Sequence, residues 1–155
     1  MPATQERNKA AMRRMLEAFN TGDGSVVKEL LHPDIIGKSR RPIPGPPILD
    51  QPAFKKVQAE MQRERTAFPD QKYEEVSMVA EGDRVVLHWQ MTGTHKGEFL
   101  GKAGTGKKVK TFGTEFVRFK AGKMIEHDDT PFHILDLLWQ LGMLTPDVLA
   151  GREFR

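Results

Sequence analysis

The chain contains no cysteine, which excludes disulfide bonds, thiolate nucleophiles and thiolate metal ligands. It also has little excess charge: 24 basic residues face 21 acidic ones, for a formal net charge of +3. That bias is too small to predict nucleic-acid binding. No stretch is apolar enough to span a bilayer, and the start of the chain lacks the apolar run of a signal peptide. We therefore expect a cytoplasmic protein that binds neither nucleic acid nor membrane.

The length of 155 residues, with 38% hydrophobic residues, predicts a single domain over 1–155 whose core covers about residues 8–144. Prolines cluster in residues 37–53 and exclude both a helix and a central strand there. We expect a flexible loop. Such a loop is either a lid or binding loop over a site, or a connector that wraps the surface.

Apolar residues at helical spacing predict helices at 8–31 and 52–68, and Asp23 or Ser25 can cap the second part of the first one. Alternating and β-rich runs then predict strands at 70–79, 84–93, 108–120 and 123–130, followed by a short helix within 132–144. Helices followed by consecutive antiparallel strands predict an α+β fold. The curved sheet should wrap around the helices as a cone, with a pocket at its open end.

The glycine-rich segment 101–108 comes close to the phosphate-binding pattern GxxxxGK[ST]. Its last position is Lys108, so the hydroxyl that would bind magnesium is missing, and a strand follows where a helix is required. We interpret the segment as a basic connection near the mouth of the pocket.

Two carboxylates stand out on the last two predicted strands. A turn at Ala121-Gly122 makes these strands a hairpin in which Glu115 lies opposite Asp129, and Val117 lies opposite His127. Two close carboxylates in a low dielectric do not easily both ionise, and His127 could stabilise the remaining anion. The trio is therefore a candidate acid–base catalyst. The alternative is a polar strand end at the rim of the sheet.

The opposite face of the strand 108–120 carries Phe112, Thr114 and Phe116, which are too apolar to be fully solvated. This face predicts a homodimer that forms through the sheet.

Other polar residues are weaker candidates. His127, Asp129 and His133 could be metal ligands, but no tight metal-binding spacing is present, so we expect no metal. A pocket for a hydrophobic small molecule would draw on the candidate lining residues His32, His88, Trp89 and Val117.

Several segments together resemble a known family: HPD at 32–34, TAFPD at 66–70, EGDRVVLHWQMTGTHKGEFLG at 81–101, TGKKV at 105–109, FVRFKAGKMIEH at 116–127 and QLG at 140–142. They are similar to the SnoaL-like polyketide cyclases, in the superfamily of nuclear transport factor 2 and ketosteroid isomerase. The resemblance runs from about Lys9 to Gly142.

The resemblance implies a nuclear transport factor 2-like (cystatin-like) α+β cone, usually a homodimer, without metal or cofactor. It also implies intramolecular aldol ring closure of a polyketide-like ester. In that chemistry an aspartate at the end of the last strand removes an activated C–H proton, and Asp129 matches its position. Glu115 stands where those cyclases have a histidine. We carry two hypotheses forward: a cofactor-independent cyclase, and a non-catalytic binding or dimerisation module on the same fold.

Overall fold

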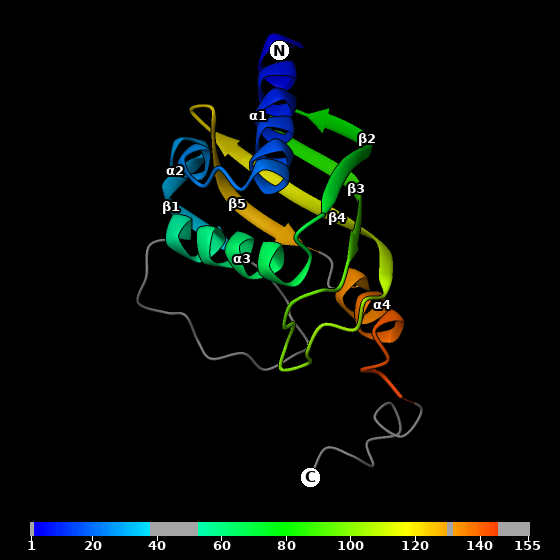
Figure 1. Ribbon diagram of the computed structural model, residues 1–155. Coiled ribbons are helices and arrows are strands. Elements are labelled where there is room, and N and C mark those ends of the chain that lie inside the picture. Colours follow the sequence, from blue (N-terminus) through cyan, green and yellow to red (C-terminus); the bar gives the residue numbers. More distant parts are fainter. Residues whose placement is uncertain (1, 38–52, 130–131, 146–155) are drawn as a thin grey trace.

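The computed structural model describes residues 2–37, 53–129 and 132–145. In chain order its elements are α1 (Pro2–Thr21), α2 (Ser25–Leu30), β1 (Leu31–Gly37), α3 (Ala53–Ala67), β2 (Lys72–Glu81), β3 (Arg84–Thr94), β4 (Lys108–Lys120), β5 (Lys123–Asp129) and α4 (Phe132–Gln140). The strands form one curved sheet in the order β1-β5-β4-β3-β2, with α1, α2 and α3 on the same side (Figure 1). The α+β prediction is confirmed. Most of the predicted proline-rich loop lies outside the described residues.

The sheet contains one strand that the sequence did not predict. β1 follows α2 directly and pairs with β5 in parallel, whereas β2 to β5 pair antiparallel as predicted. The predicted antiparallel sheet thus has one additional, parallel strand at this edge. Pro33 lacks an N–H, and a proline in a sheet is confined to edge strands, irregularities or strand starts. The outermost position of β1 and its irregular register between Leu31 and Ile36 meet that condition.

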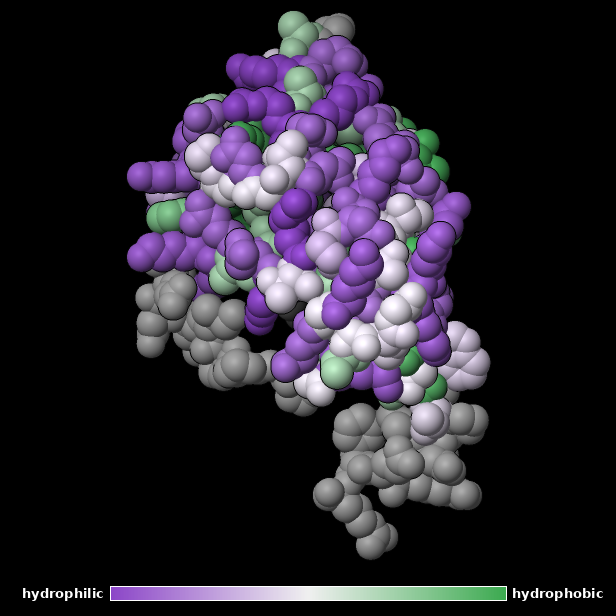
Figure 2. Space-filling model, in the orientation of Figure 1, coloured by the Kyte–Doolittle hydropathy of each residue, from purple (hydrophilic) through white to green (hydrophobic). Residues whose placement is uncertain are grey.

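The core lies between the helices and the inner face of the sheet. Its buried side chains come from α1, α3 and alternate positions of the strands, for example Met12, Met61, Leu87 and Val117. The solvent side of the helices is mostly hydrophilic (Figure 2). Burial of the apolar stripe of each helix against the sheet holds the two layers together.

The sequence predicted Asp23 or Ser25 as the cap of α2, but the N-cap residue is Gly24 and no side chain makes the cap hydrogen bond. Asp23 bonds instead to Ser25, the first residue of the helix. The Asp23 Oδ1 accepts the Ser25 N–H at 3.0 Å and the Ser25 hydroxyl at 2.5 Å. The Ser25 hydroxyl, followed by the Ser25 N–H, lowers the pKa of the Asp23 carboxyl.

Two side-chain amides form hydrogen bonds with the backbone of a strand. Each amide donates one bond and accepts one bond, as a residue of a neighbouring strand would. Asn20, at the end of α1, accepts the Tyr73 N–H at 2.7 Å and donates to the Tyr73 carbonyl at 3.0 Å. Gln140, at the end of α4, accepts the Lys110 N–H at 3.0 Å and donates to the Lys110 carbonyl at 2.6 Å. These amide clamps fix α1 to β2 and α4 to β4.

The β4–β5 hairpin has the register that the sequence predicted. Glu115 pairs with Asp129 and Val117 pairs with His127. Ala121 and Gly122 both have positive φ, 51° and 79°, as a tight two-residue hairpin turn requires. The turn pairs Lys120 with Lys123, and an irregularity between Arg118 and Phe119 then shifts the register by one residue, so that Glu115 lies opposite Asp129 and not Asp128.

The basic segment that follows β3 leads into β4, so the helix N-terminus of a phosphate-binding loop is absent there. His95, which is fully buried, anchors this segment: its Nδ1 lies 3.0 Å from the Thr105 hydroxyl and its ring packs against Phe68 and Phe99. Desolvation and the nearby Lys102 lower the pKa of His95. Within the described ranges, no helix combines the length and hydropathy needed to cross a bilayer.

Candidate functional site

The inner face of β4 contains one carboxylate among apolar and uncharged residues. Glu115 lies between Gly113 and Val117 on this face, and its side chain is 24% exposed. Its Oε2 is 3.7 Å from Nε2 of His127, which is 35% exposed. Both groups are partly buried and remain reachable from solvent. The structure therefore brings together two members of the predicted acid–base trio.

The third member, Asp129, ends β5. Its backbone pairs with Glu115, so the two residues lie directly opposite each other on neighbouring strands. Cβ atoms of directly paired residues are about 4.5–5.5 Å apart. The side chain of Asp129 lies outside the described part of the structure, as does that of His133. Within the described residues, Glu115 and His127 define the geometry of the site.

Trp89 continues the inner face onto β3, directly opposite Gly113. It is 4% exposed. The indole occupies the space above the glycine, since a Cβ at position 113 would lie 2.2 Å from Trp89 Cζ2. Glycine is thus required here because the ring crosses the neighbouring strand next to Glu115. Trp89 and Val117, both predicted to line a pocket, lie on the Glu115 face.

Tyr73 was not among the predicted site residues, but it belongs to the same inner layer. Its ring packs edge-on against Phe19 of α1 at 5.5 Å and against Trp89 at 5.1 Å. Its hydroxyl donates a hydrogen bond to Oε2 of Glu64 in α3, at 2.9 Å. Sequence reasoning missed this pair because the contact depends on how α3 lies over the sheet.

The surroundings of Tyr73 keep its hydroxyl protonated. Desolvation raises the pKa of Tyr73 well above its usual value, and the negative charges of Glu64, Glu115 and Glu60 raise it further. The ring keeps some exposed surface even though the hydroxyl is desolvated. Because the charge of Glu115 on β4 helps to raise the pKa of Tyr73 on β2, the two residues share one electrostatic environment.

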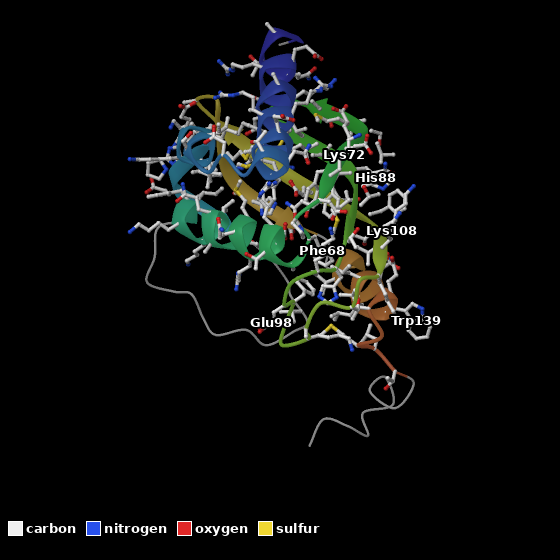
Figure 3. The ribbon with its side chains drawn as sticks, viewed as in Figure 1. Phe68, Lys72, His88, Glu98, Lys108 and Trp139 are labelled. Atoms are coloured by element: carbon white, nitrogen blue, oxygen red, sulfur yellow. The ribbon has the colours of Figure 1, made fainter. Side chains whose placement is uncertain are left out.

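Two predicted pocket residues do not reach this layer. His88 is next to Trp89 in β3 and therefore points to the opposite face, where its ring packs against Phe112 at 5.9 Å (Figure 3). The placement of His88 in the same pocket as Trp89 was wrong for that reason. His32 lies near the Leu31–Met124 end of the β1–β5 pair, whereas His127 is level with Gly37. Its Nδ1 accepts the Asp34 N–H at 3.1 Å.

Two hollows occur elsewhere on the described surface. One, of about 230 Å³, is lined by α3 and the turn before α2; the other, of about 240 Å³, is lined by α1 and residues near α2. Neither contains Glu115, His127 or Trp89. Across the described residues, no group of three or more histidine or acidic side chains could hold a metal ion.

Comparison with known proteins agrees with this fold. The chain belongs to the SnoaL-like polyketide cyclase family, whose profile matches residues 9–137. A curated relative, the aklanonic acid methyl ester cyclase AcmA of Streptomyces galilaeus, is 29% identical over 122 residues, which cover 79% of this chain and 82% of that protein.

Solved structures of similar proteins have the same fold. AclR of Streptomyces galilaeus, named as a proposed hydroxylase, is 34% identical with a TM-score of 0.76, and the match covers 91% of this chain and 99% of AclR. IdmH of Streptomyces antibioticus, named as a proposed polyketide cyclase, is 26% identical with a TM-score of 0.73, covering 87% of this chain and 98% of IdmH. Because these relatives are named for different reactions, family membership does not by itself define the reaction.

Proposed function

We propose that the protein is a cofactor-independent cyclase that closes a ring in a hydrophobic, polyketide-like ester by intramolecular aldol condensation. The observation that carries the proposal is the β4–β5 register, which pairs Glu115 with Asp129 and leaves His127 beside Glu115 on the inner face. Tyr73, which is partly exposed and packs against the buried Trp89, suits contact with a planar apolar ligand next to these groups.

In the proposed reaction, Asp129 removes a proton from a carbon next to a carbonyl group. The resulting enolate carbon attacks a second carbonyl of the same molecule, and the new alkoxide takes up a proton. His127 supports the negative charge that develops on the enolate oxygen, and Glu115 orients His127 through the 3.7 Å contact. The reaction rearranges bonds within one molecule and needs no oxidant.

Solvent deuterium exchange tests this proposal. The protein is incubated in heavy water with a polyketide-type methyl ester that carries an acidic C–H between two carbonyls. We expect catalysed deuterium incorporation at that carbon, together with a ring-closed product of unchanged mass in ordinary water, detected by mass spectrometry. Saturable binding of the ester without catalysed exchange would contradict the cyclase and favour the second candidate.

That second candidate is a non-catalytic binding module on the same fold. The observation in its favour is the packed pair of Phe19 and Tyr73, supported from below by the buried Trp89. Phe19 and Tyr73 are partly exposed and offer contact area whether or not chemistry follows.

We further propose that the protein is a homodimer that forms through the outer face of the sheet. Phe112 and Phe116 on this face are 45% and 48% exposed within one chain. Phe116→Glu should place a charge in the contact and convert the dimer to a monomer in sedimentation equilibrium. Leu100→Glu is the control, because Leu100 is also an exposed apolar residue, at 56%, but lies in the connection between β3 and β4. A monomeric wild-type protein at tens of micromolar, or dissociation by both variants, would contradict this interface.

A further inference from the structure

The single tyrosine of the chain is held in one hydrogen-bonding orientation. A phenol has one proton to donate, and the Tyr73 hydroxyl donates it to the Glu64 carboxylate at 2.9 Å. The only proton that the Tyr73 side chain can donate is therefore already hydrogen-bonded to Glu64. Its oxygen keeps lone pairs, and no donor from the described residues reaches them.

The ring of Tyr73 cannot easily turn away from this position. Phe19 and Trp89 pack against it edge-on from two sides. Asn20 holds the backbone N–H and carbonyl of the same residue. The direction of the phenol oxygen is thus fixed by contacts with α1, β3 and α3.

The polar groups that act most strongly on the Tyr73 hydroxyl are carboxylates. The carboxylates of Glu64, Glu60 and Glu115 all act on the Tyr73 hydroxyl, and each carboxylate oxygen accepts hydrogen bonds. A ligand that offers only carbonyl or ether oxygens here would place acceptor against acceptor. A ligand with a polarised O–H would satisfy the phenol oxygen and lose no protein hydrogen bond.

We propose that Tyr73 is a specificity-determining residue of the interior site: Glu64 holds its proton, so its oxygen selects ligands that present an O–H, as a phenol does. This inference deepens the proposed function, since it concerns the ligand of the same site. It distinguishes a phenol from its methyl ether, because only the phenol has a proton to donate.

A matched pair of probes tests the selection without any turnover. β-Naphthol carries an O–H, and its methyl ether has the same rings without that proton. We expect the wild-type protein to bind β-naphthol about tenfold more tightly than the ether, the scale of one well-placed hydrogen bond. Tyr73→Phe should remove the difference while leaving the affinity for the ether nearly unchanged.

Glu64 supplies a second test in which the preference changes sign. Glu64→Leu removes the acceptor and frees the phenol proton, so methyl β-naphthyl ketone, an acceptor, should then bind more tightly than β-naphthol. Glu64→Gln keeps a carbonyl acceptor at the same reach and should retain the wild-type preference. Isotope labelling of tyrosine gives one ring signal in NMR spectra, which verifies folding of each variant and reports ligand contact directly.

Several outcomes would overturn the inference: equal wild-type affinities for naphthol and ether, no binding of either probe, or an undiminished preference in Tyr73→Phe. The test is separable from the cyclase proposal because Asp129→Asn should keep the naphthol preference. If Asp129→Asn stops catalysis but keeps the preference for naphthol, the result concerns only the ring-closing chemistry. If the wild-type protein catalyses ring closure but shows no preference for naphthol, only the proposal for Tyr73 fails.

Discussion

Asp129→Asn is expected to lower the rate of ring closure, and of deuterium exchange at the acidic carbon, by about a hundredfold or more. General-base catalysis by a positioned group contributes on that scale. Asparagine has the size of aspartate but cannot take up the proton. Binding of the ester and the midpoint of urea unfolding should change little, because the variant keeps the backbone pairing with Glu115.

Asp128→Asn provides the control for that experiment. Asp128 is the neighbouring residue of the same strand and pairs with Phe116 on the outer face. The substitution makes the same change in charge and composition one position away, so it should leave turnover within about twofold of wild type, as expected of a surface substitution away from the site. Equal rates for Asp129→Asn and wild type would refute the assignment of the base, as would equal losses in the two variants.

Gly113→Ala is expected to have the largest effect on stability among the substitutions considered. The added Cβ would lie 2.2 Å from Trp89 Cζ2, which is closer than two carbon atoms can approach. Because Trp89 is buried against Tyr73, the indole cannot move freely aside. We expect the free energy of unfolding to fall by roughly 1–3 kcal/mol, the usual cost of overpacking a core. Urea denaturation followed by tryptophan fluorescence and circular dichroism measures the loss.

A double-mutant cycle identifies the contact responsible. In a Trp89→Leu background the indole is absent, so the additional loss caused by Gly113→Ala should become small. If Gly113→Ala costs the same in both backgrounds, its effect comes from the strand backbone and not from the ring. The same pair should alter ligand binding, because the indole borders Glu115.

Period-two alternation explains why the sheet and its hairpin were predictable. In residues 108–120 a strict alternation defines the inner and outer faces, and the Ala121-Gly122 turn makes the two strands a hairpin. The one-residue shift that brings Glu115 opposite Asp129 comes from the irregularity between Arg118 and Phe119. The same rule also exposes the error at His88. Its neighbour Trp89 is a buried inner residue, so His88 had to be on the other face. The signal was in the sequence.

Other features depend on contacts between distant segments and left no local pattern. β1 is short, has a proline as its third residue and pairs with a strand that lies far along the chain, so nothing in the segment HPDII distinguishes it from a loop. The Tyr73–Glu64 bond joins a strand to a helix that is positioned by α2 and β1. Neither residue is unusual in its own segment, so only the packed structure reveals the pair.

The amide clamps also make the protein sensitive to chemical ageing. Asn20 stabilises β2 only because an amide can donate and accept at once. Slow deamidation to a carboxylate would keep the acceptor for the Tyr73 N–H but would set an anion against the Tyr73 carbonyl. Since β2 is the last strand of the sheet, its unpaired edge would then be open to a strand from another molecule. Deamidation of Asn20 would thus weaken the attachment of β2 to α1 and leave an edge strand at which aggregation could begin.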